Sequence, residues 1–165
     1  MSYNLEDIFA EYGEKLLRYA TSILYNHQDA EDVVQDVFVA AHQHLSTFDG
    51  QNLQAWLYKI TYNKSINKLR RRRFLVFVGI PANTVAPEST GFSHEILHAL
   101  GQLKPKDRAL LYARIIEGCS YEELAQQMGG TAASLRKRYE RARKKAAEYI
   151  NSRHTKKGEY VHEQH

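Results

Sequence analysis

The residues most able to do chemistry in this chain are cations near its C-terminal end. The stretch GGTAASLRKRYERARKK, residues 129–145, holds seven Arg and Lys in its last ten positions, with Glu140 as the only acid. On a helix that begins near Ala132, Leu135 and Ala142 face inward. The side chains that point outward are then Arg136, Lys137, Arg141, Lys144 and Lys145. Like charges at this spacing repel, and a solvated face normally mixes both signs. We therefore favour duplex DNA binding over a plain solvated helix.

A second cationic cluster is the stretch NKSINKLRRRR, residues 63–73, which contains no acid. Aromatic side chains stand close to it in sequence: Phe48, Trp56, Tyr58 and Tyr62. Rings that stack on bases, beside cations that follow the backbone, suit single-stranded nucleic acid. The alternative is that Trp56 is a core residue and the arginines merely end a helix. Both hold together if Phe48 and Tyr58 are the more available rings.

The third constellation is acidic. In DAEDVVQDVFVAAHQHL, residues 29–45, four side chains follow the spacing i, i+3, i+4 and i+7 and form one helix stripe. They are Asp32, Gln35, Asp36 and Val39. Such a stripe is most often a solvated face. An exposed valine among carboxylates is also typical of a protein-binding surface, which has an apolar centre and a charged rim.

Charge is distributed unevenly along the 165 residues. The chain as a whole carries a net charge of +4, yet residues 1–57 hold two cations against nine carboxylates. The first part is thus strongly acidic and the rest strongly basic. This asymmetry predicts two different partners, one of them polyanionic.

Helical periodicity dominates the elements that must position these residues. We predict a first helix capped by Asn4, then helices over 29–45 and 53–73. Shorter helices follow at 93–101, 105–117 and 120–128, with a capping box at Ser120 and Glu123. A long helix over 132–151 comes after the Gly129-Gly130 turn, which is the helix-turn-helix pattern.

The predicted fold is therefore all-α, with two small helical domains joined by a flexible linker. The linker, residues 74–93, contains two of the three prolines and begins with the apolar run FLVFVGI. This run either packs against a neighbour or continues the preceding helix. The predicted parts are domain 1–73, linker 74–93, helix-turn-helix domain 94–151 and a flexible tail 152–165.

Enzyme classes fit the chain poorly. It contains no GxxxxGK[ST], GxGxxG or GxSxG motif. His94 and His98 are i,i+4 neighbours in the stretch HEILH, residues 94–98, which has the HExxH spacing. Two histidines alone do not make a zinc site, because the metal also needs a third protein ligand. We predict no catalytic residue, metal or cofactor. With no membrane-spanning apolar run and no signal-peptide pattern, the expected location is the cytoplasm.

Three motifs together resemble those of a known family. They are DAEDVVQDVF, then FDG…WLYKITYN…LRRRR, then LGQLKPKDRALLYARIIEGCSYEELAQQMG…RKRYERAR. In order and spacing, over about residues 5–149, the chain resembles the extracytoplasmic-function class of bacterial sigma factors. The resemblance implies a protein that binds core RNA polymerase and directs it to promoters, recognising the −10 element as a melted strand and the −35 element as duplex.

The resemblance also assigns residues by their positions in these motifs. The polymerase-binding residues, which dock on the clamp helices of the largest subunit, are Asp32, Gln35, Asp36 and Val39. The −10 residues are Phe48, Asp49, Gly50, Gln51, Asn52, Tyr58, Lys59 and Asn63. The −35 residues are Ser134, Arg136, Lys137, Glu140 and Arg141. The linker would pass near the RNA exit path of the polymerase.

The resemblance further implies an anti-sigma factor as a partner, often membrane-anchored in the family. The chain departs from the family at Gly130, which stands where an apolar residue is usual, and at Ala132-Ala133, which replace an acidic-glycine pair. Two other hypotheses stay open from the residues alone. One is a stand-alone helix-turn-helix regulator, and the other is an RNA-binding or phosphate-processing enzyme.

Overall fold

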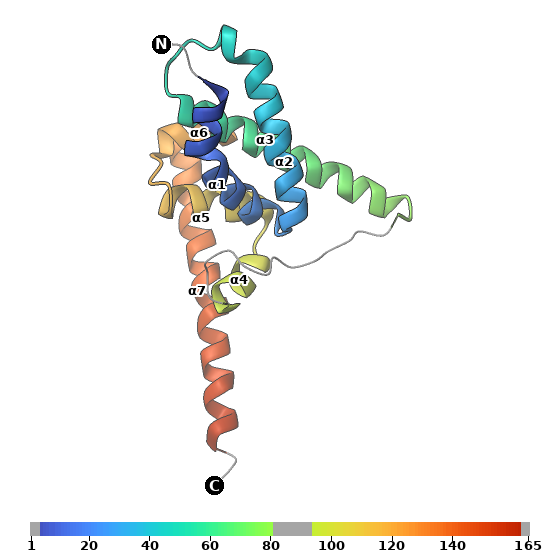
Figure 1. The fold of residues 1–165 in the computed structure, drawn as a ribbon. Coiled ribbons are helices and arrows are strands. Elements are labelled where there is room, and N and C mark those ends of the chain that lie inside the picture. Colours follow the sequence, from blue (N-terminus) through green and yellow to red (C-terminus); the bar gives the residue numbers. More distant parts are fainter. Residues whose placement is uncertain (1–3, 81–93, 163–165) are drawn as a thin grey trace.

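The computed structural model describes residues 4–80 and 94–162, without the side chains of residues 94, 95, 97 and 153–162. Its first half is a group of three helices (Figure 1). They are α1 (Leu5–Leu24), α2 (His27–His44) and α3 (Leu53–Phe77), with a short 3-10 turn, η1 (Leu45–Thr47), before α3. The all-α prediction is confirmed, since the described residues contain no strand.

Asparagine caps start all three of these helices. The Oδ1 atoms of Asn4, Asn26 and Asn52 accept hydrogen bonds from backbone N–H groups at 3.1, 2.9 and 3.0 Å. Such caps satisfy donors that the first helical turn leaves unpaired. At the other end of α1, Tyr25 takes a left-handed conformation with φ of 52° and turns the chain into α2. Local chemistry therefore sets these helix ends close to their predicted positions.

The second half contains four helices. They are α4 (His94–Gly101), α5 (Pro105–Ile115), α6 (Tyr121–Met128) and α7 (Ala132–His162). The predicted capping box is present before α6: Glu123 N donates to Ser120 Oγ at 3.1 Å, and Ser120 N donates to Glu123 Oε2 at 2.7 Å. α6, the glycine turn and α7 form the predicted helix-turn-helix.

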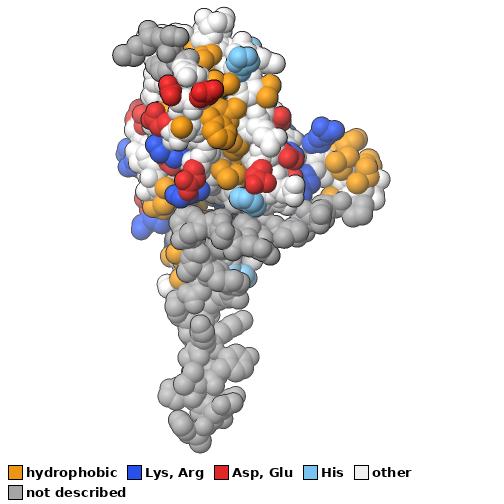
Figure 2. Space-filling view, in the orientation of Figure 1, with side chains coloured by type: hydrophobic (Ala, Val, Ile, Leu, Met, Phe, Trp, Pro, Cys, Tyr) orange, Lys and Arg blue, Asp and Glu red, His pale blue; other side chains and the backbone are white. Residues whose placement is uncertain are grey.

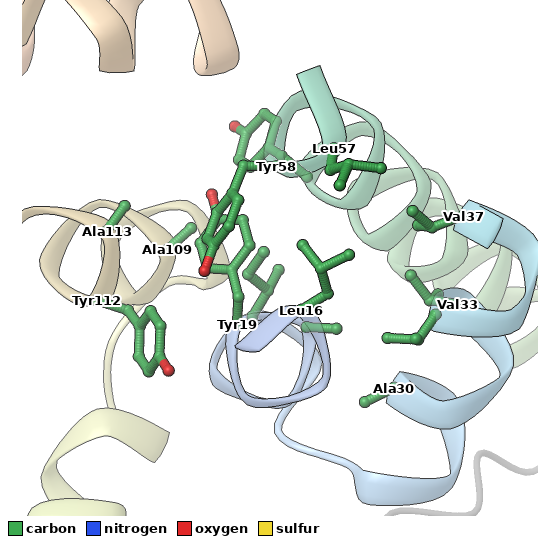
Figure 3. Close-up of a cluster of buried hydrophobic side chains, with 14 of the residues drawn as sticks. Leu16, Tyr19, Ala30, Val33, Val37, Leu57, Tyr58, Ala109, Tyr112 and Ala113 are labelled. Carbon is green, nitrogen blue, oxygen red and sulfur yellow. The ribbon is translucent and has the colours of Figure 1, made fainter. Parts of the chain in front are cut away.

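The two halves pack against each other, α1 on α5 and α3 on α6. One hydrophobic cluster runs through both. In Figure 3, Tyr19 of α1 lies between Tyr58 of α3 and the α5 residues Ala109 and Tyr112. The ring centroid of Tyr19 is 5.0 Å from that of Tyr58 and 5.8 Å from that of Tyr112. The interface between the halves is thus a buried tyrosine cluster, built from residues far apart in sequence.

Arg108 of α5 ties the halves together. Its guanidinium donates to the carbonyls of Ser22 at 2.8 Å, Ile23 at 2.6 Å and Leu103 at 2.7 Å. The first two carbonyls lie in the last turn of α1, which contains no basic residue of its own. A cation is favourable at a helix C-terminus, so Arg108 supplies from the second half the charge that α1 lacks.

Two helices continue past their predicted ends, and the beginning of the apolar run at residue 74 follows the second of its two alternatives, since it continues the preceding helix. α3 continues to Phe77, past the predicted linker start at residue 74, because neither glycine nor proline interrupts it before Gly79, whose φ is 88°. α7 continues to His162 through the predicted tail, which contains no proline. Figure 2 shows apolar side chains, with Lys and Arg beside them, at the free end of α3, where the side chain of Phe77 is 87% exposed. Residues 81–93 of the predicted linker lie outside the described residues.

Candidate nucleic-acid and protein interfaces

The acidic stripe lies on the outer side of α2. Asp32, Gln35, Asp36 and Val39 are all exposed, and the side chain of Val39 is 56% exposed. Val33 and Val37 of the same helix are buried. The helix therefore presents a valine with carboxylates and an amide around it, as the spacing predicts. That arrangement suits a protein partner with an apolar contact and cations at its edge.

Two cations of α3 turn toward α2. Lys68 Nζ donates to Asp32 Oδ2 at 2.9 Å, and Arg72 Nη1 lies 3.2 Å from Asp29 Oδ2. Partial burial by itself lowers the pKa of Lys68, but hydrogen bonding to Asp32 and the nearby charge of Asp29 outweigh it and raise that pKa. Part of the cationic cluster at 63–73 therefore holds α2 on α3. Asp36, the other carboxylate of the stripe, is exposed and is not among the carboxylates that these two cations bind.

The loop between η1 and α3 is held by turn chemistry. Asp49 Oδ1 accepts a hydrogen bond from Gln51 N at 2.9 Å, and Gly50 has a φ of 77°, which glycine adopts readily. The ring of Phe48 stacks on Trp56, with centroids 4.7 Å apart. The loop thus places five of the predicted −10 residues beside the stacked rings of Phe48 and Trp56. They are Phe48, Asp49, Gly50, Gln51 and Asn52.

A cleft of about 650 Å³ opens beside this loop. Phe48, Trp56 and Lys59 line it from the first half, and Gln126 and Gln127 of α6 line it from the second. It offers ring faces, a cation and amides, which are the groups that an unpaired base can stack on and bond to. The glutamines were not predicted, because only the packing of α6 on α3 brings them here.

Tyr58 corrects the sequence prediction. Its side chain is 1% exposed, since it faces Tyr19 and the second half, and burial raises its pKa well above the ordinary value. It was expected to be more available than Trp56, yet Trp56 is the half-buried ring that lines the cleft. Lys59 and Asn63, by contrast, are exposed on α3. In this arrangement of the halves Tyr58 cannot touch nucleic acid.

The turn before α7 depends on two glycines with left-handed backbones. Gly129 and Gly130 have φ values of 81° and 87°. Thr131 Oγ1 then accepts from Ser134 N, and Ser134 Oγ accepts from Thr131 N, both at 3.1 Å. A Cβ on Gly130 would lie 3.2 Å from Ser134 Oγ. Both the positive φ of Gly130 and the short distance from Ser134 Oγ therefore favour glycine at the position where the sequence departs from the usual apolar residue.

The outer face of α7 carries the predicted cations. Exposed side chains are Arg136, Lys137, Arg141, Lys144 and Lys145, while Leu135 and Ala142 are buried. Glu140 is also exposed and lies 3.1 Å from Arg143. Arg138 instead turns inward and donates to Asp107 of α5 at 2.6 Å. The helix is therefore fixed on its inner side and cationic on its outer side.

One contact of Arg136 was missed. Its guanidinium lies over the ring of Tyr121, 5.2 Å from the centroid, and Arg114 lies over the same ring at 4.7 Å. The signal in the sequence was an aromatic residue directly after the Ser120 cap of α6. Periodicity alone does not say which side chain of α7 that ring meets.

Within the described residues, no group of three or more His, Cys, Asp or Glu is placed to hold a metal ion. The side chain of His94, one of the two histidines considered for zinc, lies outside the described residues. None of the described helices combines the length and apolarity needed to cross a bilayer.

Comparison with known proteins identifies the family. Sigma-70 region 2 matches residues 8–74, and Sigma-70, region 4 matches residues 93–145. The RNA polymerase sigma-H factor of Pseudomonas aeruginosa is 32% identical over 152 residues, 81% of this chain and 79% of that protein. The ECF RNA polymerase sigma factor SigE of Mycolicibacterium smegmatis is 26% identical over 156 residues. The chain belongs to the extracytoplasmic-function class of sigma factors.

This sigma factor spans 61% of the length of the mycobacterial SigE and is covered to 88% by the match. Among solved structures it is similar to the sigma factor RpoE of Bartonella quintana in complex with the anti-sigma factor NepR. The TM-score is 0.74 at 28% identity, covering 88% of this chain and 98% of that one. The alternative of a stand-alone helix-turn-helix regulator is not favoured, because the first half of this sigma factor matches region 2.

Proposed function

We propose that this sigma factor binds core RNA polymerase and directs promoter-specific initiation. α2 docks on the clamp helices of the largest subunit through Asp32, Gln35, Asp36 and Val39. The loop at 48–52, with Lys59 and Asn63, holds the −10 element as a melted strand. The beginning of α7 recognises the −35 element as duplex. The work is binding and positioning, carried out in the cytoplasm, where the polymerase acts.

One observation carries this proposal: an acidic, valine-centred stripe and a cationic helix face are exposed on separate helices of one small chain. The stripe has the composition of a protein interface, and the cationic face follows the turn of a helix-turn-helix. DNA binding by a stand-alone regulator does not account for the acidic, valine-centred stripe on α2. The cleft beside Phe48 and Trp56 adds a third surface, with the rings that a melted strand needs.

An anti-sigma factor is part of the same proposal. The similar RpoE of Bartonella quintana was crystallised with the anti-sigma factor NepR. We extend this kind of partner to the present sigma factor, which then passes between an inhibitor-bound and a polymerase-bound state. A protein that covers the exposed stripe of α2 would block polymerase directly, since both need the same carboxylates.

In vitro transcription tests the function. The purified protein is mixed with core RNA polymerase and genomic DNA, and the transcripts are sequenced. We expect start sites that share a −10 and a −35 element. If no promoter-directed transcripts appear while a control sigma factor yields its own, the proposal is wrong. Tight, specific duplex binding without polymerase in a gel shift would instead support the regulator.

Charge reversal tests the polymerase surface. Asp36→Lys places a cation in the exposed stripe without removing the Asp32 to Lys68 hydrogen bond. We expect a loss of core polymerase binding of at least tenfold, because like charges then face each other. Glu11→Lys is the matched control, since it makes the same charge change at an exposed position on α1. Equal binding by the Asp36 variant and the control would refute the assignment.

A further inference from the structure

We infer that Tyr121 is a positioning residue that aims the guanidinium of Arg136 at the −35 element. The inference rests on the proposed function, because it assumes that Arg136 contacts this element. It adds a residue of α6 to a recognition surface otherwise made of α7 alone. Nothing in the order of residues along α7 indicates this contribution.

The geometry places the ring where it can act on Arg136. Tyr121 is the first residue of α6, directly after the Ser120 cap, and the capping box with Glu123 fixes the backbone there. The residue is only 9% exposed, and its ring meets Tyr139 of α7 edge-on at 6.1 Å. The aromatic platform is therefore rigid. Arg136 lies over it, 5.2 Å from the centroid, and is still exposed.

Arg114 holds the platform from α5. Its Nη1 donates to the carbonyl of Cys119 at 2.8 Å, and its guanidinium lies 4.7 Å from the centroid of Tyr121. Both contacts of Arg114 are thus with the end of the α5–α6 loop and the first residue of α6, and they hold the arginine against the Tyr121 ring. Arg136 differs, since it is an exposed residue at the beginning of α7, the part of a recognition helix that reaches base edges.

The ring matters because a free arginine has many rotamers. Holding the guanidinium on a ring face reduces the conformational freedom that binding must remove. A planar guanidinium kept in one orientation can also form the bidentate pair that distinguishes one base from another. A cation over an aromatic ring at an exposed site corresponds to about a two- to fivefold change in an equilibrium constant. The expected change in affinity is therefore modest, and base preference at the −35 element is a second, independent readout.

A double-mutant cycle tests the inference. Tyr121→Leu, Arg136→Ala and the double variant are assembled with core polymerase, and their affinities are measured for a promoter fragment mapped by the transcription assay. Each is measured again with single base changes in the −35 element. We expect Tyr121→Leu to weaken binding about threefold and to relax preference at the base pair that Arg136→Ala also relaxes. In the Arg136→Ala background, loss of Tyr121 has no further effect.

Two variants serve as controls. Tyr121→Phe keeps the ring and retains wild-type affinity and base preference. Tyr149→Leu removes a ring over which Lys145 lies at 6.0 Å, farther along α7, and leaves base preference unchanged. Circular dichroism of each variant reports whether it is folded. If Tyr121→Leu is not folded, Tyr121→Met, which also lacks a ring face, replaces it in the cycle.

The outcomes separate the inference from the function on which it rests. A Tyr121 variant that weakens all sequences equally, with or without Arg136, shows a merely structural residue and overturns the inference. Full affinity and base preference in Tyr121→Leu overturn it as well. If Arg136→Ala has no effect on promoter binding, the assignment of Arg136 itself is wrong. If wild-type protein gives no promoter-directed transcripts, the proposed function fails.

Discussion

Arg108 is a buried cation whose replacement we expect to lower the stability of this sigma factor substantially. It is 6% exposed and satisfies three backbone carbonyls, two from the end of α1 and one before α5. Arg108→Met keeps much of the side-chain volume but removes every donor. The change therefore keeps most of the packing and removes the hydrogen bonds, together with the contact of the guanidinium over the Tyr25 ring, 5.6 Å from its centroid.

The magnitude follows from two opposing effects. Burial lowers the pKa of Arg108 to about 10, which corresponds to a penalty of about 3 kcal/mol for keeping the charge inside the protein. Three hydrogen bonds from a charged donor return about 1.5–3 kcal/mol each. The bonds outweigh the burial penalty, so we expect Arg108→Met to lower the free energy of unfolding by about 3 kcal/mol.

Urea denaturation measures this difference. Trp56 is the single tryptophan and is half-buried on Phe48 near α6, so its fluorescence reports on the packing of the halves. Arg143→Met is the matched control, because Arg143 is exposed and pairs with Glu140 at the surface. The control should change stability by less than about 0.5 kcal/mol. An Arg108 variant as stable as the control would refute the argument that this guanidinium ties the halves together.

Three further predictions concern packing, pH and salt. Gly101→Ala places a Cβ 2.9 Å from the ring of Tyr25 and should destabilise the protein by about 1 kcal/mol in thermal unfolding, whereas Gly13→Ala, inside α1 with ordinary contacts, should be neutral or stabilising. Burial raises the pKa of Tyr112 to about 12. The protonated phenol therefore contributes its full stability below pH about 10, the pKa of the unfolded chain, and this contribution is lost as the pH rises through about 12. The free energy of unfolding, measured against pH, should fall in that interval and should fall less in Tyr112→Phe. Arg141→Ala should flatten the log–log salt dependence of promoter binding by about 0.9 if it contacts one phosphate, and an unchanged slope would mean that its side chain faces solvent.

Much of the secondary structure was predictable because its signals are local. Asparagines, a Ser-x-x-Glu box and a glycine pair mark helix ends within a few residues of the backbone groups that they satisfy. The same holds for the exposure of Asp36 and Arg136, since a periodicity of 3.6 residues separates the inner from the outer face of a helix. The end of α3 was misplaced, because an apolar run after four arginines has no marker of its own before Gly79.

The placement of Tyr58 shows where such reasoning stops. Periodicity places a tyrosine on one side of α3, but it does not say whether solvent or another part of the chain lies there. Here the second half covers that side, and the ring is buried against Tyr19. The full lining of the cleft beside Phe48 could not be predicted for the same reason, since Gln126 and Gln127 come from α6.

By itself, the order of residues determined the helices, their capped ends, the faces that carry charge and the family to which the chain belongs. Only the tertiary structure decided how the halves meet, which aromatic rings stay accessible and which arginines form hydrogen bonds within the fold. Arg108 bonds a carbonyl 85 positions away, and the guanidinium of Arg136 lies over a ring that belongs to another helix. Contacts of that kind depend on helix packing in three dimensions, and short-range patterns carry no information about it.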